Sequence, residues 1–182
     1  MKIEFETQVL DINPEEITKK LRSLGAEEKD EVFQKRWVFD IACLNSTQPG
    51  LGEWIRVRQY GEKAEITYKN KKGTGMSDTT EIEVEIDDFN KMAAILEKLN
   101  CFSGQYYQEN KRKQFIFDGL EFDIDFWPNI PPFLEIEGSS EDDVMKGLKL
   151  LGLKDKEHGH FGLINIYAKY GIKIHDYKEL KF

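Results

Sequence analysis

The segment TEIEVEID, residues 80–87, alternates carboxylates with branched apolar side chains. In a β-strand this alternation places the three glutamates on one face and an apolar surface on the other. The same pattern recurs in IEFE (3–6), EFDID (121–125) and LEIE (134–137). Because like charges that face each other across neighbouring strands destabilise a sheet, four acidic faces in one chain need a reason.

Strand patterns dominate the chain, with amphipathic helices between some of them. Three acidic strands run directly into a helix, so we expect helices to cover the apolar strand faces and the charged faces to point elsewhere. The predicted strands cover residues 2–10, 33–40, 53–60, 64–70, 80–87, 112–118, 120–126 and 133–137, and the predicted helices cover 14–24, 88–99, 140–151 and 163–171. Residues 44–52, 70–79 and 154–162 are predicted as mobile loops.

Three of these helices have plain start signals. Asn13 and Pro14 start the first helix, Asp88 precedes the second, and Ser140 precedes the third. The predicted apolar stripes are Ile17, Leu21 and Leu24 in the first helix, Phe89, Met92, Leu96 and Leu99 in the second, and Val144, Leu148 and Leu151 in the third. Each stripe is typical of a helix that packs on a sheet.

Basic side chains alternate in the same way. Arg56 and Arg58 share one face of EWIRVRQY (53–60), and Lys69 lies on one face of AEITYK (64–69). If the apolar faces pack outward on helices, the sheet curls around an interior with both signs of charge. A dry interior of that kind is costly, whereas a wet channel can hold metal ions on carboxylates and phosphates on Arg and Lys. The alternative, a solvated sheet face, stays open at this point.

The composition limits the classes of function. The 182 residues suffice for a proper core, and we treat 1–182 as a single domain. The net charge of −8 disfavours general nucleic-acid binding. No apolar run approaches the roughly 20 residues of a membrane span, and no signal peptide is recognisable, so we expect a cytoplasmic protein without a membrane partner. Cys43 and Cys101 lie in dissimilar contexts and indicate neither a disulfide framework nor a Cys-rich metal site.

Several segments, in this order and spacing, resemble the CYTH superfamily, whose members are also called triphosphate tunnel metalloenzymes. IEFETQ (3–8) is similar to the E-x-E-x-K motif of the first strand, with Gln8 at the lysine position. The other similar segments are QKRWVFD (34–40), EWIRVRQYGEKAEITYK (53–69) with the R-x-R and T-x-K strands, EIEVEIDDFNKMAAILEKL (81–99) and IDFWPNIPPFLEIEG (124–138). The resemblance covers residues 2 to about 150 and, for the subgroup of class IV adenylyl cyclases, continues through IYAKYGI (166–172).

The resemblance implies an α+β fold, in which an antiparallel eight-stranded β-barrel forms a triphosphate tunnel flanked by helices. The acids would then face the tunnel, where metal ions separate them from one another and from substrate oxygens. The implied catalytic residues are Glu4, Glu6 and Asp125, and the implied ligands of Mg²⁺ or Mn²⁺ are Glu4, Glu6, Glu135 and Glu137. The implied triphosphate-binding residues are Arg56, Arg58, Lys69, Arg112 and Gln8, and Glu83, Glu85 and Lys111 are candidates for the tunnel lining.

Two positions depart from the pattern of this family. Gln8 replaces a lysine and supplies no positive charge, and Asn110 stands at the first position of a K-x-R pair that ends at Arg112. Lys111 compensates only if its strand shifts by one residue, because such a shift turns each side chain to the other face. Both departures predict a weaker hold on the substrate, an altered substrate or a lower rate.

The leading hypothesis is a divalent-metal-dependent enzyme of the class IV adenylyl cyclase type, which converts ATP to cyclic AMP and pyrophosphate. One alternative is a triphosphate hydrolase of the inorganic triphosphatase or thiamine triphosphatase type. Another is a non-catalytic module that binds polyphosphate or nucleotides. In each case we expect a small triphosphate as the partner and no binding of nucleic acid. The sequence leaves open whether the protein forms a homodimer.

Other polar and aromatic residues are interpreted as structural. His158 and His160 are expected in a surface loop, His175 is expected to be solvated, and Lys71 with Lys72 is expected to form a solvated basic loop. Large aromatic side chains usually pack in the core or at its rim, and this is expected of the three tryptophans, Trp37, Trp54 and Trp127.

Overall fold

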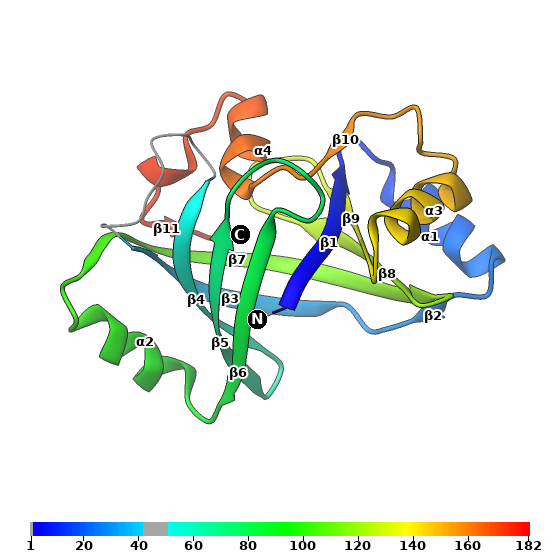
Figure 1. Cartoon of the computed structure of the whole chain (residues 1–182). Coiled ribbons are helices and arrows are strands. Elements are labelled where there is room, and N and C mark those ends of the chain that lie inside the picture. Colours follow the sequence, from blue (N-terminus) through cyan, green and yellow to red (C-terminus); the bar gives the residue numbers. More distant parts are fainter. Residues whose placement is uncertain (1, 42–50) are drawn as a thin grey trace.

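The computed structural model describes residues 2–41 and 51–182 and shows a closed β-barrel of eight antiparallel strands (Figure 1). The order around the barrel is β1-β6-β5-β4-β3-β7-β8-β9, and pairing of β1 with β9 closes it. These strands are β1 (Lys2–Val9), β3 (Val32–Ile41), β4 (Gly52–Tyr60), β5 (Lys63–Lys71), β6 (Thr79–Ile86), β7 (Phe102–Phe117), β8 (Leu120–Phe126) and β9 (Phe133–Gly138). The predicted α+β fold with an eight-stranded antiparallel barrel is confirmed.

Shorter elements surround the barrel. The helices are α1 (Pro14–Ser23), α2 (Phe89–Glu97), α3 (Glu141–Leu151) and α4 (Leu163–Lys169), followed by the 3₁₀ turn η1 (Ile174–Asp176). The short strands β2 (Glu27–Glu28), β10 (His158–Gly159) and β11 (Glu179–Leu180) extend the sheet along β7 and β1. The predicted loop 44–52 lies outside the described residues, except for Leu51 and Gly52, and Gly52 already begins β4.

The helix starts follow from local chemistry. The side chain of Asn13 accepts hydrogen bonds from the backbone N–H groups of Glu15 and Glu16, and Asp88 and Ser140 cap α2 and α3 in the same way. Each cap satisfies amide groups that have no partner within the helix. Gly152 ends α3 with a φ of 72°, in the left-handed region that glycine adopts without strain.

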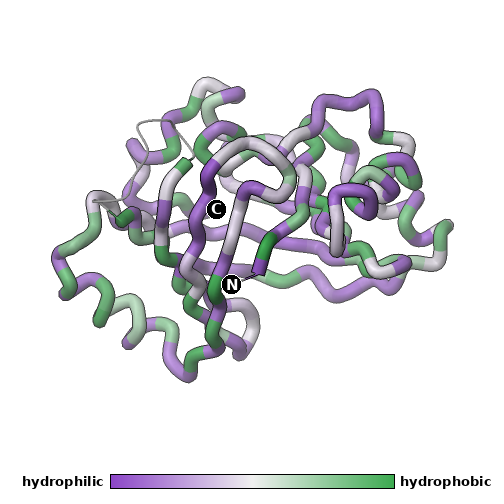
Figure 2. Tube along the Cα trace, in the orientation of Figure 1, coloured by the Kyte–Doolittle hydropathy of each residue, from purple (hydrophilic) through white to green (hydrophobic). Residues whose placement is uncertain are grey.

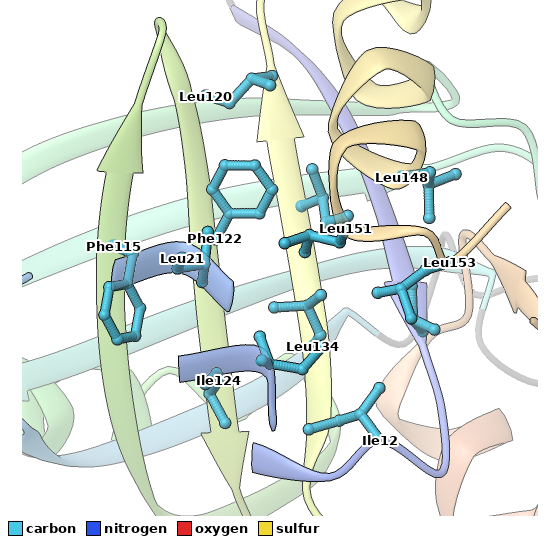
Figure 3. Packing of buried hydrophobic residues seen from close by; sticks show 13 residues of the cluster. Ile12, Leu21, Phe115, Leu120, Phe122, Ile124, Leu134, Leu148, Leu151 and Leu153 are labelled. Carbon is cyan, nitrogen blue, oxygen red and sulfur yellow. The ribbon is translucent and has the colours of Figure 1, made fainter. Parts of the chain in front are cut away.

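The largest hydrophobic cluster lies outside the barrel, between its outer face and the helices. Figure 3 shows the largest cluster, in which Phe115, Phe122 and Leu134 of the barrel pack beside Leu148 and Leu151 of α3. A second cluster packs α2 on β3, β4 and β5, and a third surrounds α4 and η1. Hydrophilic and hydrophobic residues therefore interleave along the barrel strands (Figure 2), and the hydrophilic side chains are left to face inward.

Three expectations are wrong in part. The helices leave part of the outer face of β1 and β6 uncovered, and Ile3, Ile82 and Val84 are exposed there. On β1, α3 packs at the other end of the strand, near Val9. Leu99 is also exposed, because α2 ends at Glu97. The strand predicted at 112–118 is the second half of β7, whose polar first half is held by continuous pairing with β3 rather than by an apolar pattern of its own.

None of the helices in residues 2–41 and 51–182 has the length and apolar character needed to cross a bilayer.

Candidate functional site

A cavity of about 630 Å³ opens inside the barrel. This volume is within the range of pockets that enclose small organic ligands, roughly 300–1,000 Å³. Eleven residues singled out from the sequence lie around it: Glu4, Glu6, Gln8, Arg56, Arg58, Lys69, Glu83, Arg112, Asp125, Glu135 and Glu137. The barrel therefore brings together side chains that are up to 133 positions apart along the chain, from Glu4 to Glu137.

Two residues predicted for the lining lie elsewhere. Lys111 is exposed, and its ammonium group lies 5.2 Å from the ring centre of Phe182. The reason is the register of β7, in which Arg112 pairs with Asp125 and faces inward, so that Lys111 faces outward. Glu85 is exposed near the end of β6, beyond the residues that line the cavity.

Opposite walls of the cavity carry opposite charges. The strand order places β4 four positions from β9 and β3 four positions from β1, which makes each pair face across the barrel. The basic wall carries Arg56 and Arg58 on β4 and Arg36 on β3, and the acidic wall carries Glu4 and Glu6 on β1 and Glu135 and Glu137 on β9. Such a separation creates a field across the tunnel in which a metal cation and an anion would each have a preferred side.

On the basic wall, one buried carboxylate holds two arginines. Glu65, which is 2% exposed, accepts a hydrogen bond of 2.7 Å from Nε of Arg58 and one of 3.2 Å from Nη2 of Arg56. Arg56 also donates to the hydroxyl group of Thr67 at 3.2 Å. Both guanidinium groups are thereby oriented before any ligand arrives, which lowers the entropy cost of binding one.

Four arginines converge on the cavity. Arg36 is almost fully buried and donates to Gln34 at 2.8 Å and to Asn110. Burial and then the charges of Arg56, Arg58 and Arg112 lower its pKa well below the usual value. An anion among these groups would relieve that repulsion, and arginine is the side chain best suited to bind phosphate oxygens.

Arg112 links the basic side chains to the acidic wall. Its guanidinium group donates to both oxygens of Asp125 at 2.8 and 2.6 Å, to Asp123 at 2.6 Å and to Glu135 at 3.2 Å. Asn110 donates to Asp125 at 3.0 Å. Because both oxygens of Asp125 are engaged in this way, the side chain of Asp125 positions Arg112.

On the acidic wall, Gln8 lies between two carboxylates. Its side-chain nitrogen donates to Glu6 at 3.2 Å and to Glu135 at 3.1 Å. Burial, followed by the charges of Glu135 and Glu4, raises the pKa of Glu6 to about 8. Lys69 donates to Glu4 at 2.6 Å and lies 3.5 Å from Glu81. One ammonium group therefore faces several carboxylates, and the acidic wall keeps an excess of negative charge.

Several polar residues of the cavity escaped the sequence interpretation, among them Arg36, His160 and Lys71. Arg36 lacked a motif of its own, although it lies in the segment 34–40 singled out above. His160 is 3% exposed rather than on the surface: its Nε2 lies 2.7 Å from the hydroxyl group of Thr79 and its Nδ1 lies 3.2 Å from Glu6. Burial and the charge of Lys71 lower the pKa of His160 to about 4.

Lys71 is buried as well, and it donates to the backbone carbonyl of His160 at 2.8 Å. The expectation of a solvated basic loop is therefore wrong for Lys71, because β5 extends through this residue. The signal available in the sequence was its spacing, since Lys71 shares a strand face with Lys69.

The acidic wall has the chemistry of a site for a hard divalent cation. The lining side chains include ten carboxylates and seven Lys or Arg residues, so negative charge is in excess. Two buried acceptors, Oε2 of Glu4 and Oε1 of Gln8, have no hydrogen-bond donor among the described residues. These oxygens fit Mg²⁺ or Mn²⁺.

Within residues 2–41 and 51–182, no three His, Cys, Asp or Glu side chains form a ready-made metal cluster. Mg²⁺ is commonly held by one or two carboxylates together with substrate phosphates, and the acidic wall is compatible with that mode of binding.

A closed antiparallel barrel with a tunnel of carboxylates, arginines and lysines defines the class of the triphosphate tunnel proteins. The CYTH domain family matches residues 2–158, and the chain belongs to this family. The family consists of metalloenzymes that use divalent cations. No curated protein matches the sequence.

Several solved structures share the fold. The PH1012 protein of Pyrococcus horikoshii OT3 is 22% identical, with a TM-score of 0.74 over 90% of this chain and 99% of that chain. A protein of Vibrio parahaemolyticus described as a candidate adenylate cyclase is 15% identical, with a TM-score of 0.70 over 92% and 98% of the two chains.

The protein HpAC1 from Hippeastrum is 18% identical, with a TM-score of 0.59 over 93% of this chain and 96% of that chain. It is described as a candidate adenylyl cyclase with a dominant triphosphatase activity. At these identities the three likenesses show the fold alone.

Proposed function

We propose that this protein is a divalent-metal-dependent enzyme that acts on a triphosphate inside the barrel. The observation that carries the proposal is the opposition of the two walls: Arg36, Arg56 and Arg58 face Glu4, Glu6 and the E-x-E pair of β9 across one cavity. A bare acidic site would repel a triphosphate, and a bare basic site would not gather a metal ion. The two walls together suit the complex of both.

Each group of residues in the cavity has a separate role in this proposal. Arg56 and Arg58, held by Glu65, bind phosphate oxygens, and Arg112 binds at the boundary between the two walls. Glu4, Glu6, Glu135 and Glu137 would hold the cation, with Lys69 beside Glu4. A bound divalent cation would neutralise charge on the phosphates and polarise a phosphoryl oxygen, which makes the phosphorus more electrophilic. Asp125 keeps Arg112 in place.

The finer proposal is a reaction of the class IV adenylyl cyclase type, in which the 3′-oxygen of ATP attacks the α-phosphorus and pyrophosphate leaves. Hydrolysis is the second candidate, and the description of HpAC1 as mainly a triphosphatase favours it. Both reactions require the same hold on the phosphates. They differ in the attacking oxygen and in the phosphorus that it attacks, since hydrolysis uses water on the terminal phosphorus and releases phosphate.

Product analysis tests this proposal. The purified protein is incubated with ATP, thiamine triphosphate or inorganic triphosphate, with Mg²⁺, with Mn²⁺ and in excess chelator. We expect turnover with a divalent cation and none in chelator. Cyclic AMP with pyrophosphate identifies a cyclase, and released phosphate identifies a hydrolase. Full turnover in chelator contradicts the metal dependence, and tight binding without turnover identifies a non-catalytic module.

The basic wall makes a separate prediction. Arg58→Ala should weaken binding of a non-hydrolysable ATP analogue by about 1.5–3 kcal/mol, the usual worth of hydrogen bonds to a charged group. Isothermal titration in the presence of Mg²⁺ measures the difference. Lys111→Ala is the matched control, because it removes one positive charge from the outer face of the barrel. Equal affinity of both variants and the parent would place Arg58 outside the binding site.

A further inference from the structure

A buried histidine enters the cavity from a short strand beside β1. The strand β10 pairs antiparallel with the end of β1, where Gly159 lies opposite Gln8 (Figure 1). His160 follows β10 directly, is 3% exposed and lines the cavity. It lies beyond the residues 2–158 that the CYTH family matches, and the roles assigned above do not include it. Because each ring nitrogen of a buried imidazole needs a partner, the contacts of this ring indicate what it does.

Two neighbouring strands of the barrel hold His160 in place. Its Nε2 lies 2.7 Å from the hydroxyl group of Thr79 on β6, and its backbone carbonyl accepts a hydrogen bond of 2.8 Å from Nζ of Lys71 on β5. Thr79 and Lys71 lie opposite each other in the pairing of β5 with β6, and both are buried. The side chain and the backbone of His160 are therefore tied to one place on the barrel, and this fixes the orientation of the ring.

The other ring nitrogen faces a carboxylate of the acidic wall. Nδ1 of His160 lies 3.2 Å from Oε1 of Glu6. The same oxygen accepts a hydrogen bond of 3.2 Å from the side-chain nitrogen of Gln8. Nδ1 is buried and has no well-aligned hydrogen bond among the described residues, so a bond to Glu6 would recover the free energy that an unpaired donor costs. Two nitrogen groups thus gather at Oε1 of Glu6 and leave its second oxygen for a ligand.

Hydrogen-bond chemistry assigns the protons in this row of contacts. An ionised carboxylate only accepts, so Glu6 requires the proton of a neutral imidazole on Nδ1. Nε2 then accepts from the hydroxyl group of Thr79, and their distance of 2.7 Å suits such a bond. Thr79, His160 and Glu6 thereby connect β6 to the acidic wall. Outer partners of this type orient the side chains that hold a metal ion, and their loss typically costs roughly 10–100-fold in metal affinity.

We propose that His160 is a positioning residue for Glu6. Together with Gln8, its Nδ1–H group holds Oε1 of the carboxylate, so that the second oxygen is directed to a divalent cation in the cavity. The inference rests on the proposed function, because Glu6 is one of the cation ligands in that proposal. His160 itself touches neither the cation nor the triphosphate, and its loss acts only through the hold on the cation.

The affinity of the purified protein for Mn²⁺, measured by isothermal titration without a substrate, tests this role. His160→Gln places its amide near the position of Nε2 and keeps the contact with Thr79, but it has no donor for Glu6. We expect it to bind Mn²⁺ about 10–100-fold more weakly than the parent. His160→Asn places an N–H group near the position of Nδ1 and should stay within about threefold of the parent. A histidine with a purely structural role predicts no such order, because both substitutions remove the ring.

Kinetics and controls separate positioning from damage to the fold. In His160→Gln the Mn²⁺ concentration for half-maximal turnover should rise about 10–100-fold, whereas kcat at saturating Mn²⁺ should stay within about threefold of the parent. His158→Gln is the matched control, since it makes the same chemical change on a residue that does not line the cavity, and we expect parental Mn²⁺ affinity. Thr79→Val removes the hydroxyl group at Nε2 and should also weaken Mn²⁺ binding, so it replaces His160→Gln if that variant does not fold.

A double-mutant cycle in urea, without metal, tests the contact apart from the proposed function. The effects of Glu6→Leu and His160→Gln on the free energy of unfolding should not add, since the two side chains interact in the parent. If the parent binds Mn²⁺ while His160→Gln and Thr79→Val keep parental affinity, the positioning role is refuted and the proposed function stands. Equal losses in His160→Gln and His160→Asn would also refute it. If the parent shows neither Mn²⁺ binding nor metal-dependent turnover, the proposed function fails and the cycle decides: coupled effects support the hold of His160 on Glu6, and additive effects overturn it.

Discussion

Glu135→Gln should lower kcat/KM for the best triphosphate substrate by at least about 100-fold. Substitutions that merely support a metal ligand typically cost 10–100-fold, and loss of a ligand's charge should cost no less. The substitution is isosteric, and Arg112 keeps its hydrogen bonds to Asp123 and Asp125, so the fold should persist. The comparison is steady-state kinetics with Mg²⁺ or Mn²⁺, together with the affinity for Mn²⁺ alone, which should also fall.

Glu85→Gln is the matched control for this experiment. It makes the same chemical change on an acidic strand, at an exposed position beyond the lining of the cavity. We expect its kcat/KM and Mn²⁺ affinity to equal those of the parent. A folded Glu135→Gln variant with parental turnover and parental Mn²⁺ affinity would show that Glu135 is not a metal ligand.

Arg112→Ala should lower the free energy of unfolding by about 3–5 kcal/mol, the usual cost of removing one partner from a buried ion pair. The guanidinium compensates Asp123 and Asp125, which are 5% and 1% exposed, and it also contacts Glu135. Without it these carboxylates stay buried and lose the cation that contacts them directly. Urea unfolding measures the loss as a shift of the midpoint at an unchanged m-value.

Two further variants isolate the cause. Arg22→Ala removes an exposed arginine paired with Glu28 on the surface, and its stability should change little because solvent screens that pair. Adding Asp123→Asn and Asp125→Asn to Arg112→Ala removes the uncompensated charges and should recover part of the loss. If Arg112→Ala is no less stable than Arg22→Ala, the buried carboxylates do not depend on Arg112.

Local patterns in the sequence were sufficient for most of the elements. Asn13, Asp88 and Ser140 marked three helix starts because a capping side chain acts within two or three residues of itself. The two faces of each strand could also be predicted, because successive side chains point to opposite faces of a strand regardless of the rest of the fold. The polar first half of β7 was missed, since its pairing partner β3 lies far away in the sequence.

The candidate site could be predicted only in part, because many contacts in it join residues that are far apart in the sequence. Glu4, Arg56 and Glu135 could be assigned to the inside of the barrel from alternation and family resemblance. His160 could not, because its neighbours Glu6 and Thr79 come from strands more than 80 residues away in the chain. The apolar part of the lining was missed because α4 has an ordinary helix pattern until the fold places it beside Trp127 and Phe133.

The sequence by itself determined that this protein has eight long strands with one charged face each and helices over much of the other face. These properties depend on the alternation of side chains along one strand and on short-range capping, so they can be read within a window of a few residues. Only the tertiary structure decided which charges face one another. Closure of β1 on β9 sets the acidic strands β1 and β9 opposite Arg36, Arg56 and Arg58. Apolar side chains of α4 reach the same cavity. The physical reason is that electrostatic and packing partners are chosen by distance in space, which strand order and barrel closure set.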